Sequence, residues 1–371
     1  METSRAQFLE LIKAALWRRS ADDSMFRKDV DWARIFKISQ EQAVIGVAYE
    51  GIMTLPENLR PDKVLFIRWY GLTVKIENIY HKHIEVLSKV YSFFGELGIR
   101  PVLMKGLGVA SLYPKPERRQ SGDIDLYVSQ LQDFPEILDA LTQKGMRKDA
   151  VCIASFKHVT YHLDGVELEI HNKIARMLNP FYERSLRRMT QEATQHLREA
   201  EIGGVKTTLF PVQFDAIFLL IHIITHFAEG GIGLRQLSDW TLFITKYVNE
   251  LSQESFIKEI KRLGLVFDLK LYAFFCVKYL GMDQKNAILY DPSFEKRADR
   301  LAEIVFDFGN FGQYTDEWNN CPDSYVARKI YALRVHWRYF VRTYKVAPKD
   351  AVCNLLFIYS RSAWDRMKQG R

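Results

Sequence analysis

An alternation of acidic and apolar residues at 121–128, SGDIDLYV, constrains the fold of this chain more than any other segment. In a β-strand successive side chains point to opposite faces, so Asp123 and Asp125 share one face while Ile124 and Leu126 enter the core. Two carboxylates held this close repel each other, and each disfavours ionisation of the other. A divalent cation that takes oxygen ligands from both removes this conflict, and Mg²⁺ suits such a site because it binds a few carboxylates together with phosphates.

A second acidic strand is predicted at 166–171, VELEIH. The same alternation places Glu167, Glu169 and His171 on one face of that strand. If this strand lies beside the strand at 123–128, Glu169 joins the two aspartates around a site for two metal ions. Such a site aligns an attacking hydroxyl with a phosphorus atom and stabilises the leaving oxygen.

Each acidic motif has an ordinary structural explanation when it stands alone. A single Asp-x-Asp usually marks a strand edge that faces solvent, and a Glu-x-Glu-x-His strand is often the polar face of an exposed hairpin. Here both motifs follow a glycine-led helix start within one short stretch of the chain. That combination favours a metal site over either ordinary explanation.

The predicted elements are helical at both ends of the chain and mixed in the middle. Apolar residues recur at three- and four-residue spacing before residue 98 and again after Pro211, which predicts helices in both regions. Between them, Asp164-Gly165 is a strong signal for the turn of a β-hairpin. The pattern predicts strands at 101–104, 123–128, 156–163 and 166–171, and helices at 105–112 and 131–144.

We therefore predict an α+β protein with three parts. A small mixed-sheet core at 99–209 would be flanked by N-terminal helices at 1–98 and by a C-terminal helical domain at 210–371.

The motifs together resemble the nucleotidyltransferase superfamily related to DNA polymerase β, and more narrowly an uncharacterised bacterial nucleotidyltransferase-like family with a Lys-Gly opening. The superfamily pattern is a glycine-containing strand-to-helix turn, then an Asp-x-Asp strand, then a third acid on a later strand. Lys105-Gly106 matches the turn, 119–126 (RQSGDIDL) matches the second motif, and 169–171 (EIH) matches the third. Downstream, 222–226 and 233–240 (GLRQLSDW) resemble the helical region of the narrower family.

The resemblance implies transfer of a nucleoside monophosphate from an NTP to a hydroxyl or amine acceptor, with release of pyrophosphate. It implies two Mg²⁺ ions (or Mn²⁺) as cofactors and the NTP as co-substrate. Asp123, Asp125 and Glu169 would be the catalytic metal ligands, and Glu169 would also help to deprotonate the acceptor.

The resemblance also implies a nucleotide-binding set of Lys105, Gly106, Arg119 and Ser121. Gly106 would let the backbone approach phosphate at a helix N-terminus, where N–H groups and the helix dipole favour anions. Lys105 or Arg119 would neutralise the β- and γ-phosphates. The alternatives are an ordinary strand-end lysine and an arginine in a solvated loop.

Substrate contacts are predicted at His171 and at four residues of the C-terminal helices. The helices are included because, in a two-domain transferase, the cleft wall opposite the metals comes from the helical domain. His222 and His226 share a helix face at metal-ligand spacing. With no carboxylate or cysteine between them, histidines packed in a core or cleft are favoured over a metal pair. Arg235 and Asp239 also share a helix face, and they would contact substrate or simply pair with each other.

Positive charge is concentrated at the C-terminus. Residues 324–371 contain 11 Lys or Arg and two acidic residues, Asp350 and Asp365. The formal charge of this segment is therefore 11 − 2 = +9, more than the net charge of +7 for the whole chain. The functional interpretation is a surface for RNA or another polyanion. The other interpretation, which we favour, is a pair of amphipathic helices whose aromatics are core and whose basic residues face solvent.

Composition limits the class and location of the protein. A chain that is 48% hydrophobic and 26% charged is not intrinsically disordered. The apolar stretch Ile217–Ala228 is about half the length that crosses a bilayer, so no transmembrane segment is predicted. Four widely separated cysteines and the absence of an export signal lead us to expect a cytoplasmic protein.

Two other functions stay open from the sequence. The first is a toxin-like transferase that modifies tRNA or protein and holds its target with the basic tail. The second is a catalytically silent relative that binds nucleotide or a partner protein. The three clustered acids argue against the silent form, whereas Gly106-Leu107, in place of the usual Gly-Ser or Gly-Gly pair, argues mildly for it.

Overall fold

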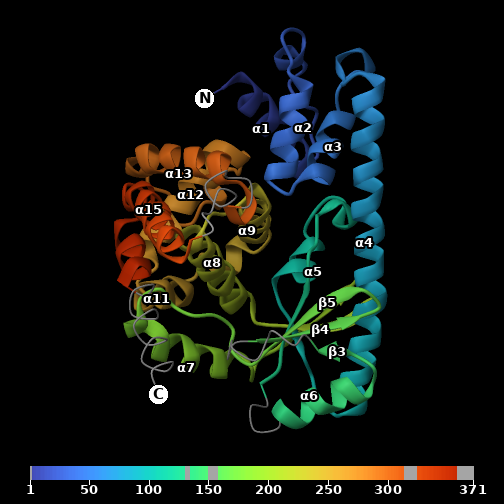
Figure 1. Cartoon of the computed structure of the whole chain (residues 1–371), viewed down its shortest axis with the longest axis vertical. Coiled ribbons are helices and arrows are strands. Elements are labelled where there is room, and N and C mark those ends of the chain that lie inside the picture. Colours follow the sequence, from blue (N-terminus) through green and yellow to red (C-terminus); the bar gives the residue numbers. More distant parts are fainter. Residues whose placement is uncertain (1, 130–133, 149–157, 313–323, 357–371) are drawn as a thin grey trace.

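The computed structural model describes residues 2–129, 134–148, 158–312 and 324–356, and Figure 1 shows helices at both ends of the chain flanking one β-sheet. The α-helices are α1 (Thr3–Leu16), α2 (Trp32–Glu41), α3 (Ile45–Met53), α4 (Lys63–Glu96), α5 (Lys105–Ala110), α6 (Phe134–Gln143), α7 (Glu183–Ala193), α8 (Val212–Glu229), α9 (Leu234–Lys246), α10 (Val248–Leu251), α11 (Glu254–Arg262), α12 (Val266–Leu280), α13 (Glu295–Phe308) and α15 (Tyr325–Tyr344). The strands are β1 (Val102–Leu103), β2 (Ile124–Tyr127), β3 (Arg147–Lys148), β4 (His158–Leu163), β5 (Val166–His171), β6 (Arg198–Ile202) and β7 (Val205–Leu209).

The seven described strands form one sheet in the order β3-β4-β5-β2-β1-β7-β6. β2 is parallel to β5 and β1 is parallel to β7, while the other neighbours are antiparallel, so the predicted mixed sheet is confirmed. The condition for a three-acid site is also met, because β5 lies beside β2. Asp164 and Gly165 form the predicted hairpin turn between β4 and β5, both with the positive φ that a type I′ turn requires.

Three strands were not predicted from the sequence. β3 is only two residues long, which is too short to show a periodic pattern. β6 and β7 form a hairpin around Gly203-Gly204, and β7 extends the sheet beside β1. The Gly-Gly pair between two alternating runs was a usable signal for this hairpin. The start of the helix predicted at 131–144 and that of the strand predicted at 156–163 lie outside the described residues.

One face of the sheet is apolar and packs against α4 and α6. Ile124 and Leu126 from β2 and Leu168 and Ile170 from β5 are at most 1% exposed and share a core cluster with residues of these two helices. The alternation along the strands therefore directs the acidic side chains to the opposite face.

The long helix α4 connects the N-terminal helices to the sheet. Its 34 residues span about 50 Å, and in Figure 1 it runs along most of the molecule. In its first half Trp69 is fully buried, and its indole N–H donates to the carbonyl of Ile45 at 3.0 Å. In its second half Val86 and Leu87 pack into the core beneath the sheet.

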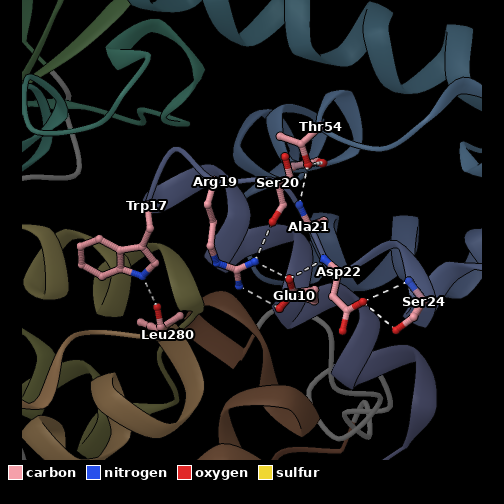
Figure 2. Close-up of polar contacts among 10 residues, drawn as sticks. Glu10, Trp17, Arg19, Ser20, Ala21, Asp22, Ser24, Thr54 and Leu280 are labelled. Carbon is pink, nitrogen blue, oxygen red and sulfur yellow. Dashed lines mark hydrogen bonds and ion pairs between the residues drawn. The ribbon is translucent and has the colours of Figure 1, made fainter.

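The N-terminal helices also contact the C-terminal ones, as Figure 2 shows for the end of α1. The indole N–H of Trp17 donates to the carbonyl of Leu280 at 2.6 Å. Arg19 donates to both carboxylate oxygens of Glu10, which also accepts from the backbone N–H of Asp22.

The domain boundaries at 98 and 209 stay a prediction, whereas the apolar core itself continues from α1–α3 into α8–α13.

Helix α8 has the length and apolar composition to cross a bilayer, and no other helix in the described ranges does. However, 67% of it is buried inside the fold. Its apolar residues are therefore explained by packing, and the helix does not indicate a membrane segment.

Within the basic tail, the structure describes 324–356. On α15, Tyr339 is buried and its hydroxyl donates to the carbonyl of Phe227, as expected of a core aromatic. Arg334 and Arg342 are exposed, and so is Trp337, at 57%. RNA binding by this tail stays a prediction.

Gly51 lies on α3 where its backbone approaches the backbone of α1 at Leu11. A Cβ at this position would lie 2.2 Å from the carbonyl oxygen of Leu11, which is backbone and cannot turn aside. We expect Gly51→Ala to lower the free energy of unfolding by about 1–3 kcal/mol in urea denaturation, the usual cost of overpacking. Gly71→Ala in α4 is the matched control, because a Cβ there meets nothing within 4 Å and helix propensity predicts a gain of about 0.5–1 kcal/mol. Equal effects of the two changes would contradict the close crossing.

Candidate active site

A cavity of about 610 Å³ lies between the acidic face of the sheet and helices α8 and α9. Eleven of the twelve site residues predicted from the sequence line it: Lys105, Gly106, Arg119, Asp123, Asp125, Glu169, His171, His222, His226, Arg235 and Asp239. Ser121 is not among the lining residues. The fold thus brings side chains from positions 105 to 239 to a single place.

Three carboxylates converge on the floor of this cavity. The parallel register of β2 and β5 places Asp125 directly beside Glu169, and Asp123 comes just before β2. One oxygen from each of the three carboxylates lies within 4.8 Å of the other two. This separation is short enough for one cation to contact all three.

Two basic side chains contact the carboxylates. The Lys105 ammonium lies 3.0 Å from Asp125 Oδ1. The Nε2 of His171 lies 2.9 Å from the same oxygen and 3.1 Å from Glu169 Oε2. Asp125 is 1% exposed, yet its second oxygen, Oδ2, is buried without a hydrogen-bond partner. A buried carboxylate oxygen with no partner is costly, which makes it a natural position for a cation ligand.

These contacts determine the protonation states of the cluster. Burial opposes the charge of Lys105, but the carboxylates of Asp125, Asp123 and Glu169 outweigh burial and raise the pKa of Lys105. Burial also opposes protonation of His171, but hydrogen bonds to Asp125 and Glu169 raise the pKa of His171 above its ordinary value. Burial acts to raise the pKa of Glu169, whereas the hydrogen bond with His171 and the charge of Lys105 lower it overall. Glu169 is therefore ionised at neutral pH and Lys105 is cationic.

A comparison with known protein families matches residues 28–281 to a family described as uncharacterised nucleotidyltransferase. The matched segment is more than half of the 371 residues and contains all twelve predicted site residues. The chain belongs to this nucleotidyltransferase family. Membership supports a general nucleotidyl-transfer activity, in a family whose members are uncharacterised.

No curated protein matches the chain. Among solved structures, an antigenic nucleotidyltransferase-like protein from Paracoccidioides brasiliensis is similar, with 16% sequence identity over 48% of this chain and 85% of its own and a TM-score of 0.32.

The turn at Lys105-Gly106 differs from the helix start predicted for this chain. Both residues have positive φ, 29° and 37°, and Gly106 has non-helical φ and ψ angles, so only glycine is comfortable there. Helix α5 is also only six residues long. The regular helix N-terminus expected at Gly106 is therefore not formed, and Gly106 places backbone near the carbonyl of Asp123. Phosphate binding at this turn stays a prediction, and both residues line the cavity.

Of the two alternatives for Arg235 and Asp239, the structure contradicts the one in which they pair with each other. Asp239 instead accepts hydrogen bonds from Nε and Nη2 of Arg119, at 2.8 and 2.6 Å, and from the Tyr113 hydroxyl at 2.7 Å. Arg235 donates from Nη1 to the carbonyl of Gln120, while its Nε is buried without a partner. Arg119 is thus largely occupied in a buried ion pair, which leaves Arg235 as the better placed donor for a ligand.

A row of rings forms the helical wall of the cavity. His222 and His226 lie edge to face with ring centroids 4.2 Å apart. The ring centroid of Phe311 is 4.8 Å from that of His226. Burial, together with the positive charge of Lys105, lowers the pKa of His222 well below its usual value. Neither histidine belongs to a metal-binding group in the part of the chain that the structure describes. The interpretation as cleft histidines therefore agrees with their environment.

The sequence reasoning missed His158, which lines the cavity from β4. The two-residue turn at Asp164-Gly165 pairs Leu163 with Val166, and counting back along the hairpin pairs His158 with His171. The position of the turn was therefore sufficient to predict that His158 lies beside His171. Tyr113 and Phe311 were also missed, because neither stands in a recognisable motif.

Proposed function

We propose that this chain transfers a nucleoside monophosphate from an NTP to a hydroxyl or amine acceptor and releases pyrophosphate. One observation carries the proposal: Asp123, Asp125 and Glu169 converge in a cavity large enough for a nucleotide, with one buried carboxylate oxygen unpartnered. Family membership supports the same class of reaction.

The carboxylates fit a divalent cation. Their oxygens are the ligand type that Mg²⁺ and Mn²⁺ prefer, and Asp125 Oδ2 has a position for a ligand bond that no protein group uses. When bound, the cation would link the carboxylates to the substrate phosphates and offset the charge of the leaving pyrophosphate.

The remaining roles belong to the chain itself. The acceptor atom forms a bond to the α-phosphorus as the bond from that phosphorus to the α–β bridging oxygen breaks, and pyrophosphate leaves with the electron pair. The acceptor proton passes to Glu169, which is ionised. Lys105 remains cationic beside the carboxylates and offsets phosphate charge. Arg235 donates from its unpartnered Nε to a phosphate or to the acceptor.

Water can serve as a surrogate acceptor, so the reaction is testable without the natural one. We expect incubation with an α-labelled NTP and Mg²⁺ to yield slow, metal-dependent formation of NMP and pyrophosphate. Attack at the α-phosphorus gives these products, whereas γ-attack gives NDP and inorganic phosphate. Formation of NDP, or NMP formation that persists in excess EDTA, would contradict the proposal.

The same label separates the three functions that the sequence left open. Label in a small hydroxyl or amine compound supports the proposed transferase, and label in tRNA or protein supports the toxin-like form. A catalytically silent relative would bind NTP with metal yet release no pyrophosphate with water, tRNA or protein. RNA binding through the basic tail would also weaken steeply with salt.

A further inference from the structure

Three ligand-type side chains meet on the β4–β5 side of the cavity. In the antiparallel register His158 is opposite His171, and Thr160 is opposite Glu169. Residues 158 and 160 on β4 and residues 169 and 171 on β5 therefore share one face of the sheet. The centroids of the two imidazole rings are 5.0 Å apart, and Glu169 lies two residues before His171 on β5.

The ligand atoms have the separations of neighbours around a metal ion. His158 Nε2 lies 3.5 Å from Glu169 Oε1, and His171 Nε2 lies 3.1 Å from Glu169 Oε2. Ligands on bonds of about 2.1 Å are about 3.0 Å apart at right angles and about 3.4 Å apart in a tetrahedron. One ligand atom from each of the three residues lies within 4.8 Å of the others.

We propose that His158, Glu169 and His171 form a second cation site, selective for a transition metal such as Zn²⁺ or Co²⁺. Imidazole nitrogen suits these ions, whereas Mg²⁺ and Ca²⁺ take oxygen ligands. The site shares Glu169 with the carboxylate group of Asp123 and Asp125, so two cations would lie side by side. It does not depend on nucleotidyl transfer, because the three residues would bind the ion without any nucleotide.

The site is accessible from the cavity. All three residues line the cavity, and their side chains are 26%, 18% and 9% exposed for His158, Glu169 and His171. An ion can therefore reach them without any opening of the fold. Partial burial also limits the number of waters that complete the coordination, which favours the lower coordination numbers of Zn²⁺ and Co²⁺ over the six of Mg²⁺.

Cobalt titration of the chain, without a histidine tag or nucleotide, tests the proposal. We expect Co²⁺ to give visible ligand-field absorption that Zn²⁺ removes and that excess Mg²⁺ leaves in place. His158→Ala should weaken Co²⁺ binding at least about 10-fold, since even partners outside the ligand shell cost 10–100-fold. His196→Ala, which removes an exposed histidine that does not line the cavity, is the matched control and should bind as wild type does.

Equal cobalt affinity and spectrum in wild type and His158→Ala would overturn the proposal. A measurement on wild type alone guards against misfolding of the variant: anomalous scattering from a cobalt-soaked crystal should place a peak within bonding distance of both imidazole nitrogens. A peak confined to Asp123 and Asp125 would overturn the second site and leave the proposed transferase intact. Failure of the transferase would appear separately, as absence of NMP formation in Mg²⁺.

Discussion

Replacement of Asp125 by asparagine is expected to lower metal-dependent NMP formation by about 10³-fold or more. A bound metal ion contributes several kcal/mol of charge stabilisation to a transition state of this kind, and each 1.36 kcal/mol is tenfold in rate. The substitution removes one carboxylate oxygen, which includes the loss of the unpartnered Oδ2 as a ligand, and it removes the negative charge that faces Lys105 and His171. The measurement is NMP formation from α-labelled NTP, together with calorimetric titration of Mn²⁺ into each variant.

Asp125 is buried, so its replacement also affects packing and needs a second variant. Asp123→Asn changes a half-buried ligand and should lose Mn²⁺ binding in the same way. Asp164→Asn is the matched control: it makes the same chemical change at the β4–β5 turn, where asparagine tolerates the φ of 52° and only an exposed pair with Lys89 is lost. Undiminished Mn²⁺ binding in both cavity variants, each folded like the control, would disprove the proposed metal site.

The sequence allowed much of the acidic site to be predicted, because strand alternation and one turn determine it. The period of two directed Asp123 and Asp125 to one face and Ile124 to the other, as the buried cluster beneath the sheet confirms. The pairing of β2 with β5 was a condition that the sequence could state but not decide. Long-range strand order depends on which apolar faces pack together, and no local pattern encodes that.

The remaining features depend on contacts between distant segments. Asp239 was predicted to share a helix face with Arg235, which is true, but its ion pair is with Arg119, 120 residues earlier. Helical spacing shows which neighbours are possible and says nothing of a competing partner from another element. The turn at Lys105-Gly106 has the same limitation, since a Lys-Gly pair does not specify the positive φ values of both residues.

Replacement of Asp239 by alanine is expected to lower the free energy of unfolding by about 3–5 kcal/mol, the cost of removing one partner from a buried ion pair. Asp239 and Arg119 are each 5% exposed, and the carboxylate also accepts from the Tyr113 hydroxyl. Without it, the Arg119 guanidinium stays buried with no counter-ion. Urea denaturation measures the loss, and Arg188→Ala, which breaks the exposed pair with Glu192, should cost less than about 1 kcal/mol.

A double change separates the ion pair from simple loss of packing. In Arg119→Met/Asp239→Leu neither charge of the pair remains, so the double variant should be more stable than Asp239→Ala, and its loss should be smaller than the sum of the single losses. Additive losses would show that the two residues act independently, contrary to their 2.6 Å contact.

Because this pair joins α9 to the loop before β2, its loss should also weaken NTP binding in the cavity that both elements line. A variant that loses stability yet binds NTP as wild type does would show that the pair stabilises the fold without positioning the site.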